Sequence, residues 1–325
     1  MAVRHSSCVP QLSKNALTVL EKRYLRKDQN GLVIEKPAGP TSHDVVQKVR
    51  KALGTRRVGH GGTLDPDATG VLLVATGLAT RFFPFLSKEA KSYDGRIRLG
   101  FATDTYDVSG RPAAEESRDL PGLARLEAAM RSFEGPIMQM PPRFSAKKIG
   151  GRPVYKLARA DADFELKPAA VTVFRFALRD YQPPVLAFEA ECSAGTYIRS
   201  LAHDLGQLLG CGAHLDKLRR TSVGPYALGD AVPLAVVEED AARGEADRHI
   251  IPLERLLPEA PSIAVLAEAE TRVAHGSYLG PSHIQGPPPP VEAPFVRIFS
   301  ASGRLLALAR PLDDGSGLHP FLVLS

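Results

Sequence analysis

A glycine-dense turn that carries one carboxylate is the strongest chemical signal in this sequence. Residues 59–70 read GHGGTLDPDATG, so Asp65 is followed directly by Pro66 and shares the turn with His60. Glycines permit backbone angles forbidden to other residues and let a ligand approach the main chain, whereas proline fixes φ. The turn could therefore present a single catalytic acid at a set angle. Asp65 could equally be a turn aspartate whose side chain bonds its own backbone.

Two common glycine motifs do not fit this turn. A phosphate cradle requires Lys and then Ser or Thr after the last glycine, but Gly70 is followed by Val71 and Leu72. A dinucleotide fingerprint places its glycines between a strand and a helix. Here the turn instead precedes VLLVATG (71–77), an apolar, valine-rich segment that predicts a buried strand. The segment by itself leaves both interpretations of Asp65 open.

Several further blocks surround the turn in a fixed order. They read EKPAGPTSHDVV (35–46), KSYDGRIRLGFATDTYDVSG (91–110), PPRFSAKKIGGRPVYKLAR (141–159), ECSAGTYIRSLAHDLG (191–206) and LRRTSVGPY (218–226). In this order and spacing, the chain from about Gly31 to its end resembles the TruB family, the tRNA pseudouridine-55 synthases. The resemblance implies an isomerase that converts the uridine at position 55, in the T-loop of tRNA, to pseudouridine.

The same resemblance implies roles for individual residues. Asp65 matches the catalytic aspartate, Arg199 the arginine that pairs with it, and Tyr93 a tyrosine expected to stack on the target base and to accept a proton. His60 matches a histidine that enters the space left by the flipped nucleotide, and Lys36 is expected to pack beneath the site or to contact RNA. By residue type alone, Tyr93 is more typical of core packing, and Arg199 could be a solvated helix arginine and His60 a turn histidine. The place of Arg199 in the first helical turn after a strand and a glycine favours an inward side chain.

Pseudouridine formation cleaves a glycosidic bond, turns the base and rejoins it through carbon, without redox change. The reaction therefore needs no cofactor and no metal, but it needs a shielded carboxylate that is ionised at neutral pH. A nearby guanidinium would keep Asp65 charged, whether it attacks as a nucleophile or removes a sugar proton. Asp67 replaces a residue that is usually apolar in the family. A like charge there would raise the pKa of Asp65, so we expect Asp67 to point to solvent.

The distribution of charge favours a nucleic-acid partner. The chain of 325 residues has a formal net charge of +5, and residues 135–160 contain no acid. Aromatic residues interrupt this basic stretch, and its prolines and glycines predict a loop, which suits RNA binding but also describes a solvated surface. In relatives the region is an insertion that closes over RNA. Its cations are therefore expected to bind the substrate, namely Arg143, Lys147, Lys148, Arg152 and Lys156.

Hydrophobic patterns predict an α+β fold. Strands are expected at 92–99, 171–178 and 185–192, and helices at 81–86 and 123–133. Two further helices are expected after Ser42 and Thr196, which are the predicted N-caps. Because strands and helices do not alternate regularly, the sheet should be mixed and largely antiparallel with flanking helices. This agrees with the pseudouridine synthase fold that the resemblance implies.

Three regions are predicted along the chain. Residues 1–30 lie outside the family pattern and are expected to be weakly ordered, with one short helix at 12–28. Residues 31–250 form the predicted catalytic domain, with the insertion at 135–160. Residues 251–325 contain a predicted hairpin (296–299 with 305–309) and a final strand (321–324), and they resemble the small β-barrel PUA module that binds RNA.

Composition narrows the cellular setting. Cys8, Cys192 and Cys211 form no CxxC pair, which fits a reducing cytoplasm and offers neither a zinc site nor a disulfide framework. No run of about 18 apolar residues and no signal-peptide core is present, so a cytoplasmic protein without a membrane anchor is expected. The family implies a monomer that acts on the tRNA T-arm. Two alternatives stay open: an RNA-binding or tRNA-folding protein, and a subunit of an RNA-guided pseudouridine synthase.

Overall fold

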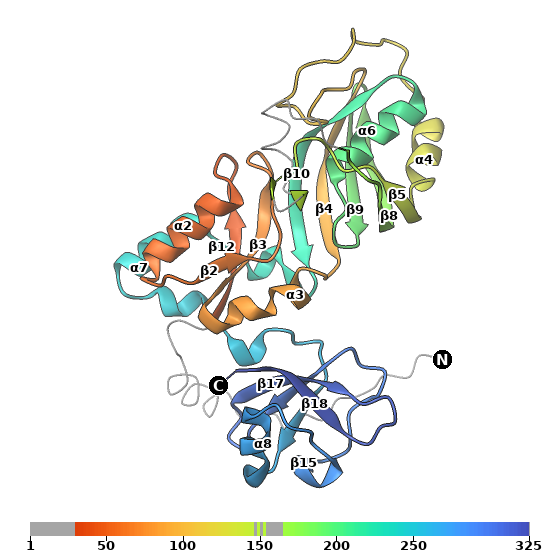
Figure 1. Ribbon diagram of the computed structural model, residues 1–325. Coiled ribbons are helices and arrows are strands. Elements are labelled where there is room, and N and C mark those ends of the chain that lie inside the picture. The colour runs from red at the N-terminus through yellow and green to blue at the C-terminus, as the bar shows by residue number, and fades with distance from the viewer. Residues whose placement is uncertain (1–29, 146–147, 150–151, 154–164, 325) are drawn as a thin grey trace. The chain divides into compact units, whose positions relative to one another are not determined.

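The computed structural model describes residues 30–145, 148–149, 152–153 and 165–324 (Figure 1). By its internal contacts the chain divides into two compact units, one spanning Leu32–Ile250 and the other containing Ile251 onward together with Asn30 and Gly31. The helix predicted at 12–28 lies outside the described residues. Asn30, which was assigned to the extension, is instead the first residue of a strand.

One mixed sheet is the frame of the larger unit. Its strands are β1 (Asn30–Lys36), β2 (Val58–His60), β3 (Thr69–Thr76), β4 (Lys91–Leu99), β5 (Gly135–Gln139), β8 (Ala169–Gln182), β9 (Val185–Cys192), β10 (Ala213–Val223), β11 (Tyr226–Ala227) and β12 (Val232–Pro233). Their order is β12-β1-β3-β10-β4-β9-β8-β5, with β2 beside β3 and β11 beside β10. The β1–β12 and β3–β10 pairs are parallel, whereas the four pairs from β10 to β5 are antiparallel. The predicted mixed, largely antiparallel sheet is confirmed.

The centre of this sheet brings together residues that are far apart in the sequence. On β10, Arg220 lies opposite Gly70 of β3 on one side and opposite Tyr93 of β4 on the other. A Cβ atom on Gly70 would lie 2.2 Å from the carbonyl oxygen of Arg220, and its φ is +98°. The last glycine of the turn is therefore required by the close approach of β10. β9 coincides with its predicted bounds, and its residues alternate between buried and partly exposed.

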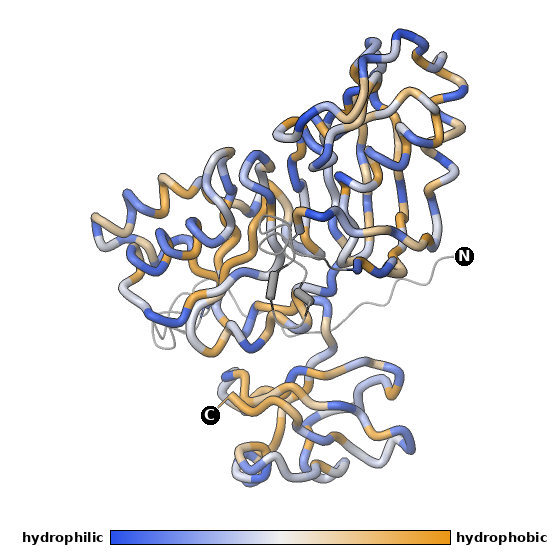
Figure 2. Tube along the Cα trace, turned by 45° about the horizontal axis from the view of Figure 1, so that its top comes forward, coloured by the Kyte–Doolittle hydropathy of each residue, from blue (hydrophilic) through white to orange (hydrophobic). Residues whose placement is uncertain are grey.

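Two pairs of helices cover the two halves of the sheet (Figure 1). α2 (Ser42–Ala52) and α7 (Leu234–Ala242) contact each other and share a core with β1 and β3. α4 (Leu123–Arg131) and α6 (Ile198–Leu209) share a second core with β4, β8 and β9. A 3₁₀ turn (Gly77–Phe82) and α3 (Phe83–Leu86) follow β3, where a helix was predicted. In Figure 2 hydrophobic and hydrophilic residues alternate along these elements, as one-sided burial requires.

Both predicted N-caps were wrong. Thr41 caps α2, because Asp44 stands three residues after Thr41 and completes a capping box with it. Ser42 is instead buried, and its hydroxyl donates to the Leu64 carbonyl at 3.0 Å and accepts from the Leu64 amide at 2.8 Å. The start of α2 therefore fixes the backbone beside Asp65. α6 begins without a side-chain cap, since the Thr196 hydroxyl donates to the Ser193 carbonyl.

The smaller unit contains a second sheet. Its strands are β14 (Ser262–Val265), β15 (Ile284–Gln285), β16 (Val296–Phe299), β17 (Leu305–Pro311) and β18 (Leu318–Val323), in the order β15-β14-β16-β17-β18. The predicted hairpin is confirmed as β16–β17, and the predicted last strand begins earlier, at Leu318. No pairing of β15 with β18 is recorded for the described part of the chain, so the closed barrel remains a prediction. Among the described residues, no helix is long and apolar enough to cross a membrane.

Candidate active site

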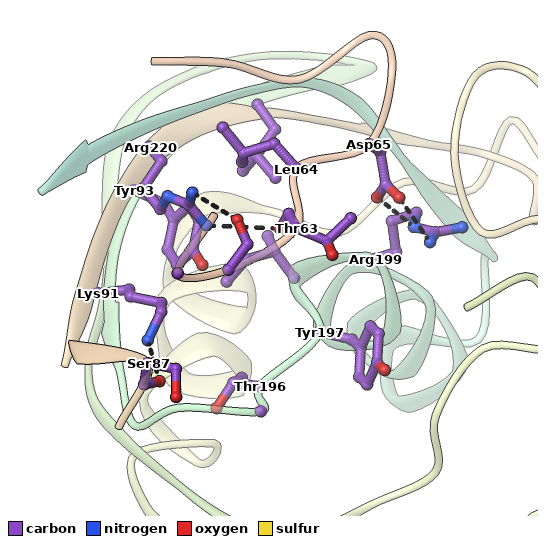
Figure 3. A pocket seen from close by; sticks show the side chains of 15 residues that line it. Thr63, Leu64, Asp65, Ser87, Lys91, Tyr93, Thr196, Tyr197, Arg199 and Arg220 are labelled. Atoms are coloured by element: carbon purple, nitrogen blue, oxygen red, sulfur yellow. Dashed lines mark hydrogen bonds and ion pairs between the residues drawn. The ribbon is translucent and has the colours of Figure 1, made fainter. Parts of the chain in front are cut away.

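A pocket of about 290 Å³ opens beside the glycine-dense turn (Figure 3). Its walls come from the turn, from the start of β4, from the residues leading into α6 and from the middle of β10. The lining residues are Gly61, Gly62, Thr63, Leu64, Asp65, Ser87, Lys91, Tyr93, Gly195, Thr196, Tyr197, Ile198, Arg199, Leu218 and Arg220. The structure therefore brings together the three predicted catalytic residues, Asp65, Tyr93 and Arg199.

Asp65 and Arg199 form an ion pair with two contacts. Arg199 Nε lies 2.9 Å from Asp65 Oδ2, and Arg199 Nη2 donates to Asp65 Oδ1 at 3.1 Å. Arg199 is in the first turn of α6, so the fold points it inward as expected, with 6% of its side chain exposed against 42% for Asp65. A two-contact guanidinium–carboxylate pair fixes both the charge and the orientation of the acid. One carboxylate is thus held at the pocket wall while remaining accessible to a ligand.

Arg199 has further partners that were not predicted from the sequence. Its Nη1 donates to the Thr105 carbonyl at 3.1 Å and lies 3.3 Å from Asp107 Oδ2, and its Nη2 donates to the Phe144 carbonyl at 2.8 Å. Asp107 stands in the quoted block 91–110, but its sequence context does not show that it reaches α6. Arg199 is therefore shared between two carboxylates and two carbonyls, which restricts its movement.

Burial raises the pKa of Asp65, and Arg199 opposes that shift. Although 42% of the side-chain surface is accessible, desolvation by the surrounding protein is the largest influence on the carboxyl. Asp107 also raises the pKa of Asp65, and Lys36 lowers it. Asp67 is exposed, as expected, and is not among the groups that shift the pKa of Asp65. The neighbouring acid that matters is therefore Asp107.

Lys36 lies beneath the turn. Its side chain has no exposed surface, and its ammonium donates to the carbonyls of Pro37 at 2.9 Å, Pro66 at 2.8 Å and Ala68 at 2.7 Å. Desolvation lowers the pKa of Lys36 to about 8, although Asp65 and Asp67 oppose the shift. The structure therefore supports the packing role and corrects the expectation of RNA contact, because no surface of Lys36 is available to RNA.

Tyr93 and Arg220 form the opposite wall of the pocket (Figure 3). Burial raises the pKa of the Tyr93 hydroxyl, and the Arg220 guanidinium beside it opposes the shift. Arg220 is 1% exposed and donates to the carbonyls of Val71 at 2.7 Å, Gly62 at 3.1 Å and Thr63 at 3.4 Å. The sequence analysis did not single out Arg220. The alternation of β10 was the available signal, since an inward residue must follow exposed Arg219.

Lys91 is a second cation on this wall that was not predicted. Its ammonium donates to the carbonyls of Ser87 at 2.9 Å and Glu89 at 2.7 Å, just after α3 ends. Desolvation, helped by the nearby Arg220 charge, lowers the pKa of Lys91 to about 8. Its type and place in the quoted block KSY were a usable signal.

Comparison with known proteins decides the family. The TruB family pseudouridylate synthase N-terminal domain matches residues 50–198, and the tRNA pseudouridylate synthase B C-terminal domain matches residues 199–258. Over 293 residues the chain is 40% identical to tRNA pseudouridine synthase B of Solibacter usitatus, covering 90% of this chain and 99% of the relative. The chain belongs to the TruB family. It is 43% identical to the Thermobifida fusca tRNA pseudouridine synthase B over 88% of this chain and 95% of that relative.

Solved structures show the same fold. The crystal structure of the archaeal box H/ACA sRNP Nop10–Cbf5 complex matches with a TM-score of 0.69 and 25% identity, over 94% of this chain and 89% of that chain. An H/ACA RNP bound to a substrate RNA containing 2′-deoxyuridine matches equally well, over 92% and 86% of the two chains. The pseudouridine synthase fold is thereby confirmed. As a TruB family member the chain is an isomerase, a tRNA pseudouridine synthase.

His60 is the last residue of β2 and stands shortly before Asp65 in the sequence. Its Nδ1 accepts from the Gly62 amide at 3.4 Å, and burial lowers its pKa, so the imidazole is neutral at pH 7. His60 is half-buried and is not among the residues that line the pocket. The role that the TruB resemblance implies for His60 therefore stays a prediction.

The predicted RNA-binding cations are described only in part. Arg143 is exposed and stands directly before Phe144, whose carbonyl binds Arg199. Lys148 belongs to β6 (Lys148–Ile149) and Arg152 to β7 (Arg152–Pro153), which pair antiparallel. Lys147 and Lys156 lie outside the described residues. RNA binding by this TruB insertion remains a proposal.

Proposed function

We propose that this enzyme isomerises the uridine at position 55, in the T-loop of tRNA, with Asp65 as its catalytic carboxylate. The observation that carries the proposal is the two-contact ion pair between Asp65 and Arg199 at the wall of a pocket that Tyr93 also lines. A carboxylate that is oriented, neighboured by a cation and still 42% exposed can act on a bound nucleotide. The remaining residues are assigned around it.

The reaction requires that the target base leave the folded loop. Flipping costs roughly a few kcal/mol, because stacking and pairing are lost. In our proposal the flipped uracil enters the pocket and stacks on Tyr93, while the flat imidazole of His60 fills the vacated space. The N1–C1′ bond then breaks and a C5–C1′ bond forms. The C5 proton leaves and N1 gains a proton, so the product is an isomer of the substrate.

Asp65 acts at the sugar, either by attacking C1′ or by removing the C2′ proton. Both roles use the ionised carboxylate, and Arg199 favours that form against the effect of burial. Tyr93 is proposed to accept the C5 proton. Burial keeps the Tyr93 phenol neutral at pH 7, so its own proton passes to N1 as the resulting phenolate takes the proton from C5, and the Arg220 charge lowers the cost of forming that anion. Asp65 and Tyr93 thus act on different bonds.

Recognition of the T-arm is assigned to shape and backbone charge. The proposed contacts come from the insertion, where Arg143, Lys147, Lys148, Arg152 and Lys156 supply positive charge. The C-terminal unit is proposed to be a PUA-like module that adds RNA contacts. We propose a monomer that works in the cytoplasm on free tRNA.

One observation favours a second candidate. Solved structures similar to this chain include an H/ACA RNP bound to a substrate RNA and a Cbf5–Nop10–Gar1 complex, which are assemblies of several components. The curated relatives at about 40% identity are named tRNA pseudouridine synthase B and are matched over most of their length. This favours the stand-alone enzyme over a subunit of an RNA-guided one.

Incubating the purified protein with an unmodified tRNA transcript, followed by mapping of pseudouridine, tests the proposal. The stand-alone enzyme is expected to modify position 55 with no other macromolecule present. Product at another position would overturn the T-loop assignment. Product only after addition of guide RNA and partner proteins would establish the guided alternative. Binding without product under all conditions would favour an RNA-binding or tRNA-folding protein.

A further inference from the structure

One turn of α6 contacts the loop of residues 103–109 through two side chains, Arg199 and His203. Arg199 and His203 stand four residues apart on α6, so their side chains lie on the same helix face. Arg199 binds the Thr105 carbonyl and the Asp107 carboxylate, as described above. His203 stacks on Tyr106, with ring centroids 3.8 Å apart and planes inclined by 16°. We call residues 103–109 the Arg199-supporting loop.

Tyr106 has an unusual backbone for its residue type. Its φ is +65°, in the left-handed region that favours glycine, and bulky residues rarely occur there. A non-glycine residue keeps such a conformation only when its surroundings impose it. Here the Tyr106 amide donates to the Thr103 carbonyl at 3.2 Å, and its carbonyl accepts from the Leu215 amide at 3.0 Å. The reversal at Tyr106 places its two neighbours, Thr105 and Asp107, on the Arg199 side.

The two oxygens of the Asp107 carboxylate have different partners. Oδ1 accepts from the Thr105 hydroxyl at 2.7 Å and from the Ser109 amide at 3.0 Å, so the loop holds this oxygen. Oδ2 faces Arg199 at 3.3 Å. The acid therefore reaches Arg199 only as long as the loop keeps its shape. The loop's shape is in turn tied to α6 through the Tyr106 ring.

His203 contacts the loop through its aromatic ring. Its Nδ1 is buried and has no hydrogen-bond partner among the described residues. Burial lowers the pKa of His203, so the ring is neutral at pH 7 and stacks as a flat aromatic surface. Burial raises the pKa of the Tyr106 hydroxyl, the Asp204 charge adds to that shift and the Arg143 charge opposes it.

We propose that the Tyr106–His203 ring pair is a positioning device, which fixes the Arg199-supporting loop so that Thr105 and Asp107 orient Arg199 toward Asp65. Neither ring touches the reacting atoms. The proposal rests on the catalytic role proposed for Asp65. It predicts that loss of either ring lowers the rate of the chemical step, because a misplacement of about 1 Å at a catalytic group costs up to about 100-fold.

Tyr106→Gly is the sharpest variant, because it removes the ring while relieving the left-handed backbone. We expect kcat to fall between about 10- and 100-fold, with the KM for tRNA and the thermal midpoint little changed. Tyr106→Phe keeps the ring and should retain near-normal kcat. Val108→Gly, at an exposed position of the same loop, controls for added backbone freedom and should also remain active. His203→Ala, which leaves the loop sequence intact, should reproduce the loss of kcat.

A double-mutant cycle identifies the route of the effect. If the rings act through Asp107 and Arg199, Tyr106→Gly adds little to the loss caused by Asp107→Asn, whereas independent effects would multiply. Full kcat in folded Tyr106→Gly and His203→Ala, or strict multiplication in the cycle, would overturn the proposal. The readout is pseudouridine formed anywhere in a tRNA transcript, so an error in the position-55 assignment does not affect it. An active Asp65→Asn alongside an impaired Tyr106→Gly would reject the role of Asp65 alone.

Discussion

Two buried arginines line one pocket and serve it differently. Arg199, 6% exposed, contacts two carboxylates, Asp65 and Asp107. Arg220, 1% exposed, donates to three backbone carbonyls and lies beside a neutral phenol, and no carboxylate partner is recorded for it among the described residues. A guanidinium facing an acid controls its charge, whereas one enclosed by carbonyls fixes backbone. Arg199 therefore sets the charge and orientation of the catalytic carboxylate, whereas Arg220 holds the backbone of the turn and lies beside Tyr93.

The largest expected effect separates charge from geometry at Arg199. Arg199→Gln should lower kcat by about 100-fold or more, because Asp65 loses both its orientation and its counter-ion. Burial and Asp107 then raise the pKa of Asp65 unopposed by Arg199. Activity needs the ionised acid and is lost as pH falls through its pKa, so the acid limb of the pH–rate profile should move to higher pH. Arg199→Lys keeps the charge but not the two-contact geometry. It should therefore lower kcat, while the acid limb of the pH–rate profile moves less than in Arg199→Gln.

Arg220→Met should lower the free energy of unfolding, and it should also lower kcat, though less than Arg199→Gln does, because the Tyr93 anion loses its neighbouring charge. The change leaves the carbonyls of Gly62, Thr63 and Val71 without their donor, at a cost of about 2–4 kcal/mol in the free energy of unfolding. Denaturant unfolding measures it. Arg219→Met is the matched control, since its exposed ion pair with Glu35 contributes at most about 1 kcal/mol. An unfolding free energy of Arg220→Met equal to that of Arg219→Met would contradict this role of Arg220.

Lys36 resembles Arg220, because it is a buried cation that donates to three backbone carbonyls. Lys36→Met should destabilise the fold by about 1–3 kcal/mol, since the Pro37, Pro66 and Ala68 carbonyls lose their shared donor. Its pKa is lowered to about 8 from 10.5, so between these values the unfolded chain binds more protons. As pH rises through that window, the free energy of unfolding of the wild type should therefore increase relative to that of Lys36→Met. A pH-independent difference in unfolding free energy between the two proteins would contradict the assignment.

The smallest expected effect is at Asp67. Asp67→Leu should keep or gain activity, with kcat within about two-fold of wild type, because Asp67 is exposed and does not shift the pKa of Asp65. Steady-state kinetics on tRNA measure this. A large loss would mean that the exposed acid, and not only Asp107, belongs to the charge balance around Arg199.

Sequence patterns predicted what depends on local periodicity. β9, the β16–β17 hairpin and the inward direction of Arg199 follow from alternation and from a glycine before a helix. Each N-cap was misassigned by one residue, because Thr41 and Ser42 offer similar hydroxyls at the start of α2, and α6 follows Tyr197, which makes no side-chain cap bond. Only the position of Asp44 relative to Thr41 decides the cap of α2.

Residues whose roles depend on distant backbone were not predictable in the same way. The acceptors of Arg220 come from the turn and from β3, about 150 residues earlier, and two of the three acceptors of Lys36 come from about 30 residues later. By residue type alone, Arg220 and Lys36 would be assigned to the surface. Asp107 reaches Arg199 only because Tyr106 reverses the chain, and a left-handed tyrosine has no sequence signature. Tertiary contacts decide each of these roles.

The central claim is that an Arg199-held carboxylate at position 65 carries out the isomerisation. Its most direct test is single-turnover pseudouridine formation by Asp65→Asn at saturating tRNA, with binding measured on the same preparation. The change keeps the side chain's size, removes its charge and replaces one acceptor oxygen with an NH2 donor. We expect tRNA affinity within about three-fold of wild type and no detectable product. Isomerisation at the normal rate by this variant would contradict it.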